Sequence, residues 1–427
     1  MLSITACSNP TESDAVCLDE SGNPLNVAPL SARVDLATPK FSNPKNVTNP
    51  LFPIARLDRA LLLGAVDGKP LRVETTLLAE PRTIELDGEE IETLVSQYVA
   101  WIGGRIAEVA IDLYAQADDG AVWYFGEDVF NYENGVVNDI EGTWHAGEEG
   151  PAAMIMPASP KVGDVFRPEN ICGVVFEEVT VKSIGMTVTG PRGPVTGAIV
   201  VEELHMDGGR ESKTFAPGYG EFHTADGTDL EAIALAVPTD ALPGPVSASV
   251  RTLTSGAITI FDAALVGDWS LATATISAMN SAWNSFRAGG VPPMLEASMR
   301  TALAALTTAV NARQVAAARQ AAVDAHRVGL DFELRHRPRA DIDLALLDNW
   351  ARQLLVDVAA GNRANALGSA ASLRWIRERL GHDLTDAEAR RIDSELGKLR
   401  MAAQVSDLPR AAAAAAGLRA AISVARS

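Results

Sequence analysis

Between Leu71 and Val237 the chain consists of long, apolar-rich runs separated by two-residue turn signals. The runs include LRVETTLLAE, IETLVSQYVAWI, RIAEVAIDLYAQ and AVWYFGEDVF. The turn signals Asp87-Gly88, Gly103-Gly104, Asp119-Gly120 and Asn134-Gly135 follow one another at intervals of 15 or 16 residues. Asp-Gly and Asn-Gly adopt the positive φ of tight hairpin turns, so this rhythm predicts long antiparallel strands joined in series.

The segment Ile111–Trp144 carries the densest aromatic cluster and is predicted to form three consecutive strands. After a proline-rich loop at 151–165, four further strands are expected, over Val174–Thr189, Ala198–Met206, Lys213–Thr224 and Glu231–Val237. Nine or ten antiparallel strands in series favour a curved up-and-down sheet or a barrel, because curvature covers the strand edges. The β domain is predicted over residues 48–240.

The composition changes after Asp268 to Ala, Arg and Leu at helical spacing. A linker over residues 241–267 and an antiparallel helical bundle over 268–427 are predicted. The expected helices are Leu271–Arg287, Leu295–Asn311, Gln314–Arg335, Asp343–Ala360, Asn365–Gly381, Asp386–Val405 and Arg410–Ala425. Turns near Asn311, Gly361 and Ser406 suggest three repeated helical hairpins, with core anchors at Trp283, Phe332, Trp350 and Trp375.

Charge divides the chain at the same place. Residues 1–267 contain 16 Lys and Arg against 39 Asp and Glu, a net charge of −23, whereas residues 268–427 contain 20 against 16, a net charge of +4. An acidic domain argues against a nucleic-acid partner, since phosphates require a basic face. Apolar runs are too short for a membrane-spanning helix. Attraction between the two oppositely charged parts is a hypothesis for how they meet.

The first residues suggest export. Ile4-Thr5-Ala6-Cys7 is similar to a lipoprotein cleavage site, which would make Cys7 the lipid-modified residue. Six residues precede Cys7, too few for a complete signal peptide, so either the true start lies upstream or the match is coincidental. The polar segment up to residue 47 is predicted to be a flexible tether, so that residues 1–47 form no domain of their own. Cys17 and Cys172 then either form a disulfide or remain free thiols.

A family resemblance covers about Thr48 to Val237. The strings YAQADDGAVWYFGED, YENG, GTWHAG, IMPASPKVGD and APGYG occur in this order. In this order they resemble the motifs of an uncharacterised family of secreted bacterial proteins. The resemblance implies a secreted all-β domain and no particular activity. The helical region departs from family members that end near the last strand.

The strongest candidate for a ligand site is the aromatic strand and the segment after it. Strand alternation predicts Trp123, Phe125 and Glu127 on one face and Tyr124 on the other. They would form an aromatic cavity with Glu127 or Asp128 as the polar group, alternatively a plain sheet core with charges at its rim. The candidate ligand-binding residues are Trp123, Phe125, Glu127, Asp128, Trp144 and His145.

Catalytic and metal-binding motifs give weaker signals. His145, His205 and His223 lack ligand spacing such as HxH or HExxH, and His326 and His336 are too far apart on one helix to share an ion. No cofactor, metal site or catalytic residue is predicted. The expected function is that of a non-catalytic, exported, lipid-anchored envelope protein whose β domain binds a small ligand or an envelope partner, with the membrane contacted through the lipid alone. One alternative is an envelope hydrolase that uses Glu127 or Asp128 with a spatially adjacent histidine; another is metal binding by the helical bundle.

Overall fold

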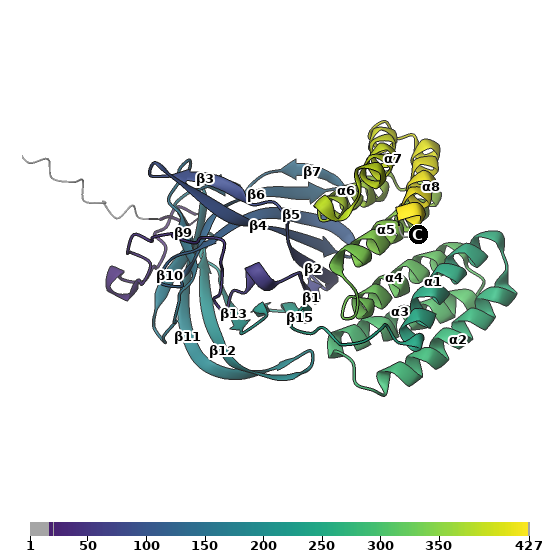
Figure 1. Ribbon diagram of the computed structural model, residues 1–427, viewed down its shortest axis with the longest axis horizontal. Helices are drawn as coiled ribbons and strands as arrows, with labels where there is room; N and C mark the ends of the chain where they lie inside the picture. The colour runs from purple at the N-terminus through teal and green to yellow at the C-terminus, as the bar shows by residue number, and fades with distance from the viewer. Residues whose placement is uncertain (1–16, 20, 426–427) are drawn as a thin grey trace, which may run out of the picture.

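The computed structural model describes residues 17–19 and 21–425. A curved antiparallel sheet forms one half of the molecule and a set of helices the other (Figure 1). The strands are β1 (Arg59–Val66), β2 (Lys69–Leu77), β3 (Arg82–Leu86), β4 (Glu89–Ile102), β5 (Arg105–Gln116), β6 (Val122–Glu133), β7 (Val136–Asp139), β8 (Trp144–His145), β9 (Ala153–Met156), β10 (Val165–Ile171), β11 (Val175–Gly190), β12 (Gly193–His205), β13 (Arg210–Ala216), β14 (Gly220–Asp226) and β15 (Asp229–Val237). The α-helices come after all of them, which confirms the predicted order of a β region and then an α region.

The fifteen strands form one sheet in the order β10-β11-β12-β13-β14-β15-β1-β2-β4-β5-β6-β7, with β3 on β4 and with β8 and β9 on β6. Within the described residues every pairing between these strands is antiparallel, and the two ends of the order do not pair, so the sheet is curved and open. Positive φ angles occur at Asp67, Asp87 and Asn134, each directly before a glycine. Asp87 and Asn134 therefore adopt the conformation that the sequence predicts, whereas at Asp119-Gly120 only the glycine has a positive φ.

Eight α-helices follow in the described part of the chain: α1 (Ala248–Val266), α2 (Trp269–Arg287), α3 (Pro293–Asn311), α4 (Val315–Glu333), α5 (Arg339–Ala359), α6 (Arg363–Glu378), α7 (Asp386–Gln404) and α8 (Leu408–Ala425). Three short 3-10 helices, η1 (Leu30–Ala32), η2 (Ile54–Arg56) and η3 (Gly381–Asp383), complete the elements. Helix α1 packs against α2 and α4, and α5 packs against α6 and α8.

Helix α1 occupies most of the predicted linker 241–267, so that prediction is wrong. The prolines that suggested a linker lie before the helix, and Ser247 caps it by accepting a hydrogen bond from the Val250 amide. Apolar residues then recur at helical spacing up to Phe261, and Gly267 ends the helix with a φ of 74°. The proline-rich segment is a short connection to α1, which is one helix more than the seven expected from the sequence.

The predicted tether is also wrong for its described part. Cys17 forms a disulfide with Cys172, across 155 residues. Further along, Ser42 hydrogen-bonds to Asp118, and Val47 is 2% exposed in the core. Apolar side chains spaced among the polar ones hold this segment against the sheet. Cys7, the predicted lipidation site, lies outside the described residues.

The sheet and the helices share a continuous core. Trp101 of β4 stacks on Trp350 of α5, with 5.8 Å between ring centres, and donates a hydrogen bond to Ser372 of α6. Trp375 of α6 donates to the Tyr132 hydroxyl of β6 at 2.8 Å. Two of the four predicted bundle anchors, Trp350 and Trp375, therefore pack against the sheet.

A buried ion network crosses the same interface. Arg72 of β2 contacts Glu74 at 2.6 Å and Asp331 of α4 at 2.7 Å. Arg59 of β1 pairs with Asp343 of α5. Burial alone would raise the pKa of Glu74, but the surrounding arginines hold it far below its usual range. Arg59 and Arg72 come from the acidic part of the chain, and their partners Asp331 and Asp343 come from the helical part. The pairing is therefore local and does not follow from the overall charges of the two parts.

The described helices include none that is both long enough and apolar enough to span a membrane.

Candidate functional site

A β-bulge in β6 decides which way its side chains point. Asp112 of β5 lies opposite Glu127, and Tyr114 lies opposite Tyr124, so β6 has one more residue between these pairs than β5 has. Gly126 allows this with a φ of 107°, and a Cβ atom there would lie 2.1 Å from the Trp144 carbonyl oxygen. Glu127 therefore shares a face with Tyr124, contrary to the simple alternation expected from the sequence.

The other aromatic candidates belong to the core. Trp123, Phe125 and Trp144 are each at most 5% exposed. The Phe125 ring packs edge-on against Phe41 with 5.3 Å between ring centres, and the Trp144 ring packs edge-on against Tyr124 with 5.4 Å. None of these three side chains lines the cavity described below.

Asp128 and His145 lie on the opposite side of the strand from Glu127. The His145 Nε2 atom is 3.1 Å from an Asp128 carboxylate oxygen, and Arg82 donates to the other oxygen at 2.8 Å. No serine, threonine or cysteine in the described part of the chain hydrogen-bonds to the His145 ring. The pair thus has a carboxylate and a histidine within reach, as the hydrolase alternative requires, but neither a nucleophile nor a place in the cavity.

A cavity of about 250 Å³ lies on the Glu127 face, inside the curve of the sheet. Strands β1, β2, β4, β5, β6 and β15 and the start of β14 form its walls, and the segment Phe52–Leu57 with helix η2 crosses it. Figure 1 shows this short helix, in purple, within the curve. The acidic residues that line it are Glu108, Asp112, Glu127, Glu221 and Glu231. The aromatic ones are Phe52, Tyr98, Tyr114 and Tyr219.

Asp112 is the most deeply placed of these carboxyls. Asp112 is only 7% exposed, and the Tyr124 hydroxyl donates a hydrogen bond to its Oδ1 atom at 2.9 Å. Burial raises the pKa of Asp112 to about 7; the Tyr124 hydrogen bond opposes this and the negative charge of Glu108 adds to it. Burial likewise raises the pKa of Glu231 to about 8 and that of Glu127 well above its usual range. Near neutral pH the cavity therefore contains carboxyl groups that take up and release protons.

These raised values predict a stability that depends on pH. A carboxyl whose pKa is higher in the folded state stabilises the fold below its unfolded pKa, and that stability is lost as the pH rises through the folded value. The free energy of unfolding should fall between pH 5 and pH 8, and Asp112→Asn should flatten this dependence. Urea denaturation at four pH values measures it. The control Asp128→Asn, outside the cavity, should keep the wild-type slope, and an unchanged slope in Asp112→Asn would contradict the assignment.

The cavity residues carry a signal that the sequence analysis missed. In the run RIAEVAIDLYAQ, Glu108, Asp112 and Tyr114 occupy alternate positions with Ala110, hence one face of an otherwise apolar strand. Two carboxyls on one face of a long, largely buried strand indicate a polar interior surface. The partners Tyr98 and Glu231 come from distant strands and could be assigned only with the sheet order.

A second acidic group lies further along the same sheet. Glu177, Glu203 and His205 have ligand atoms close enough for one metal ion. The Lys213 ammonium, however, lies 2.7 Å from Glu203 and 3.2 Å from Glu211 and so occupies the role of the cation. Hydrogen bonds that the His205 ring donates to Glu177 and Glu211 raise the pKa of His205 to about 10. The positive charges of Lys213 and His205 therefore compensate the carboxylates of this cluster.

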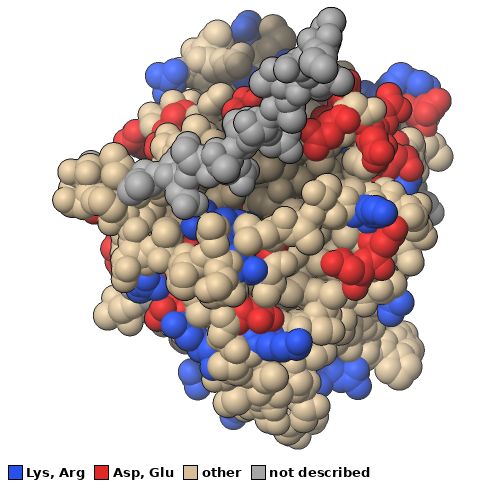
Figure 2. Space-filling view, turned by 90° about the vertical axis from the view of Figure 1, so that its left-hand side faces the viewer, with Lys and Arg blue, Asp and Glu red and all other residues tan. Residues whose placement is uncertain are grey.

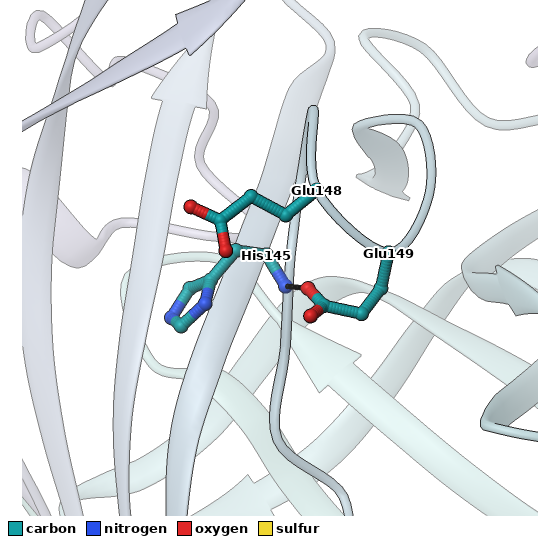
Figure 3. Close-up of side chains that lie close together, drawn as sticks. All are labelled: His145, Glu148 and Glu149. Carbon is teal, nitrogen blue, oxygen red and sulfur yellow. Dashed lines mark hydrogen bonds between the residues drawn. The ribbon is translucent and has the colours of Figure 1, made fainter.

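The group His145, Glu148 and Glu149 also has metal-binding geometry, on a surface turn. Figure 3 shows the Glu149 carboxylate on the main-chain nitrogen of His145, while the imidazole points away from it. Glu149 accepts that hydrogen bond at 2.9 Å, and the Nε2 atom of the ring lies 3.1 Å from Asp128. The Glu149 carboxylate thus has a structural partner in the main chain.

The helices offer little for the alternative of metal binding by the bundle. No group of three suitable ligands lies within reach of one ion among the helices as far as the structure describes them. His326 is buried, its Nδ1 atom lies 2.9 Å from Asn349, and burial lowers its pKa to about 4. His336 lies 3.1 Å from the Gly244 carbonyl oxygen.

The outer surface carries charges of both signs. Figure 2 shows, at the sheet end of the molecule, Asp and Glu side chains gathered towards the upper right and Lys and Arg side chains scattered across the rest. The lining of the cavity differs from this face because all of its charged residues are acidic.

Comparison with known proteins gives no family to which the chain can be assigned: no protein-family model matches it, and no curated protein matches it either.

Proposed function

We propose that this chain is an exported, non-catalytic binding protein, attached to a membrane through lipid at Cys7, whose β domain takes a small ligand inside the curve of its sheet. The observation that carries the proposal is the cavity, which has aromatic walls, a few convergent polar groups and a crossing segment from Phe52 to Leu57. Such cavities are the usual form of small-molecule sites. The resemblance to secreted bacterial proteins supports the same location.

The disulfide supports export. Cys17 and Cys172 join the first described residues to the sheet, and structural disulfides persist in oxidising compartments outside the cytosol. A lipid on Cys7 would then place the sheet close to the membrane surface, because only nine residues lie between Cys7 and Cys17. The helical region would support the sheet, since the two share one core.

Native mass spectrometry tests both parts of this proposal. Protein extracted from the membranes of cells that make it should carry a lipid mass on Cys7 and retain a small molecule. Ala110→Leu should lose the small molecule, because Ala110 is buried and lines the cavity. Cys7→Ser should lose the lipid and the membrane association but keep the small molecule.

The results separate the two parts. An unmodified Cys7 in membrane-extracted protein would end the anchoring proposal. Equal retention of the small molecule by wild type and Ala110→Leu, or retention by neither, would end the proposal that the cavity binds it.

A further inference from the structure

The charge of the cavity narrows the class of ligand. Its five acidic residues face one space, and its lining, in the described part of the chain, has no lysine, arginine or histidine. The nearby Lys213 lies outside the lining, pairs with Glu203 and Glu211, and also interacts electrostatically with the lining residues Glu221 and Glu231. No such cation compensates Glu108, Asp112 and Glu127, so an anionic ligand would approach these carboxyls unfavourably.

Asp112 gives a second, independent indication. It is more than nine-tenths buried and lines the cavity, yet the Tyr124 hydroxyl is the only group of another described residue that donates to its carboxyl. A carboxylate has room for about four hydrogen bonds across its two oxygens. Buried polar groups normally have their partners, so a carboxyl with so few, directed into a cavity, calls for a ligand that supplies positive charge or donors.

The aromatic walls identify the kind of cation. Phe52 and Tyr114 pack edge to face with 4.8 Å between ring centres, and Tyr114 stacks on Tyr124 at 4.9 Å. Phe52, Tyr98 and Tyr114 line the same cavity as the carboxyls. Hard metal ions prefer oxygen ligands alone, whereas organic ammonium groups are bound by aromatic faces together with carboxylates.

We propose that the cavity binds a compact organic cation, an amine or a quaternary ammonium, with Asp112 and Glu127 as counter-ions and the rings of Phe52, Tyr98 and Tyr114 as walls. This inference rests on the proposed binding function and specifies its ligand class. Asp112 and Glu127 suit the role because they lie directly opposite each other on neighbouring strands.

Protonation gives the site a measurable signature. In the empty cavity burial favours the neutral carboxyls, and a bound cation favours the ionised ones, so binding should release protons. The groups that face Asp112 are Glu108, Tyr114, Tyr124 and Glu127, all acidic or neutral. With a pKa of about 7, Asp112 is ionised to about one tenth at pH 6 and nine tenths at pH 8, so affinity should rise roughly tenfold over this interval.

Titration calorimetry of the full chain with choline and with its neutral isostere 3,3-dimethylbutan-1-ol tests the inference. Choline should bind more tightly at pH 8 than at pH 6 and release protons, whereas the isostere should bind at least about tenfold more weakly. Asp112→Asn and Glu127→Gln should each weaken choline about tenfold or more. Asp128→Asn, which changes the neighbouring carboxyl on the other face, should bind as the wild type does, and a melting curve for each variant verifies folding.

Each other outcome counts against the inference in a defined way. Equal affinity for choline and its isostere, or stronger binding of calcium ions than of choline, would overturn the organic-cation class. If choline fails while a neutral molecule is retained by the wild type and lost by Ala110→Leu, the ligand class is wrong and the binding function stands. If nothing is retained and nothing binds, both are wrong.

Discussion

Replacement of Asp343 by alanine is expected to lower the free energy of unfolding by about 3–5 kcal/mol. Asp343 is completely buried, pairs with Arg59 and lies 3.0 Å from Arg339. Its loss leaves Arg59, itself only 2% exposed, without its closest anion; Glu74 remains at 3.9 Å. An uncompensated buried guanidinium is much more costly than a missing surface pair.

The matched control is Asp341→Ala, two residues earlier in the same helix. The Asp341 carboxylate is half exposed and lies 3.5 Å from Arg337, so its loss should change the free energy of unfolding by less than about 0.5 kcal/mol. Urea denaturation, followed by tryptophan fluorescence, measures both. A loss below about 1 kcal/mol for Asp343→Ala would show that the network adapts by admitting water.

The second large effect is expected from the disulfide. Cys172→Ser should lower the free energy of unfolding by about 5 kcal/mol in the chain-entropy view, since Cys17 and Cys172 close a loop across 155 residues. Without the bond the unfolded chain regains conformational entropy, and this stabilises the unfolded state relative to the folded one. Denaturation of oxidised wild type and of Cys172→Ser gives the difference.

Reduction supplies the control for that comparison. Dithiothreitol should destabilise the wild type to the level of Cys172→Ser and should leave the variant unchanged. Peptide mapping without reduction should recover the Cys17–Cys172 pair. Equal stability of oxidised and reduced wild type would mean that the bond constrains a segment already held by its packing, such as Leu25 against Phe176.

The parts of the fold that depend on local chemistry could be predicted from the sequence. Helix α7 begins directly after Thr385, whose side chain forms a capping box with Glu388. The hairpin turn at Asn134-Gly135 has the expected positive φ. Caps and tight turns are formed by residues that are neighbours in the chain, so the local sequence predicts them.

The parts that depend on tertiary contact could not be predicted. Helix α1 was hidden by the prolines before it, and the segment before residue 48 looked polar because its few anchors, such as Val47, are widely spaced. In the candidate site the decisive element was Gly126. One extra residue in β6 places Glu127 in the cavity and leaves Trp123 and Phe125 in the core. The bulge depends on the close packing of Gly126 against Trp144, which the local sequence pattern does not show.

The position of the disulfide has a mechanical consequence. Tension applied between the two ends of the chain follows covalent bonds, and at Cys17 the shortest route passes across the sulfur bridge to Cys172. The intervening stretch, which includes η2, β1, β2, β4, β5 and β6, therefore carries no stretching load while the bridge is intact. The crossing segment and most of the strands around the cavity are sheltered from a pull at either terminus, and β10, which ends just before Cys172, also lies within the sheltered loop.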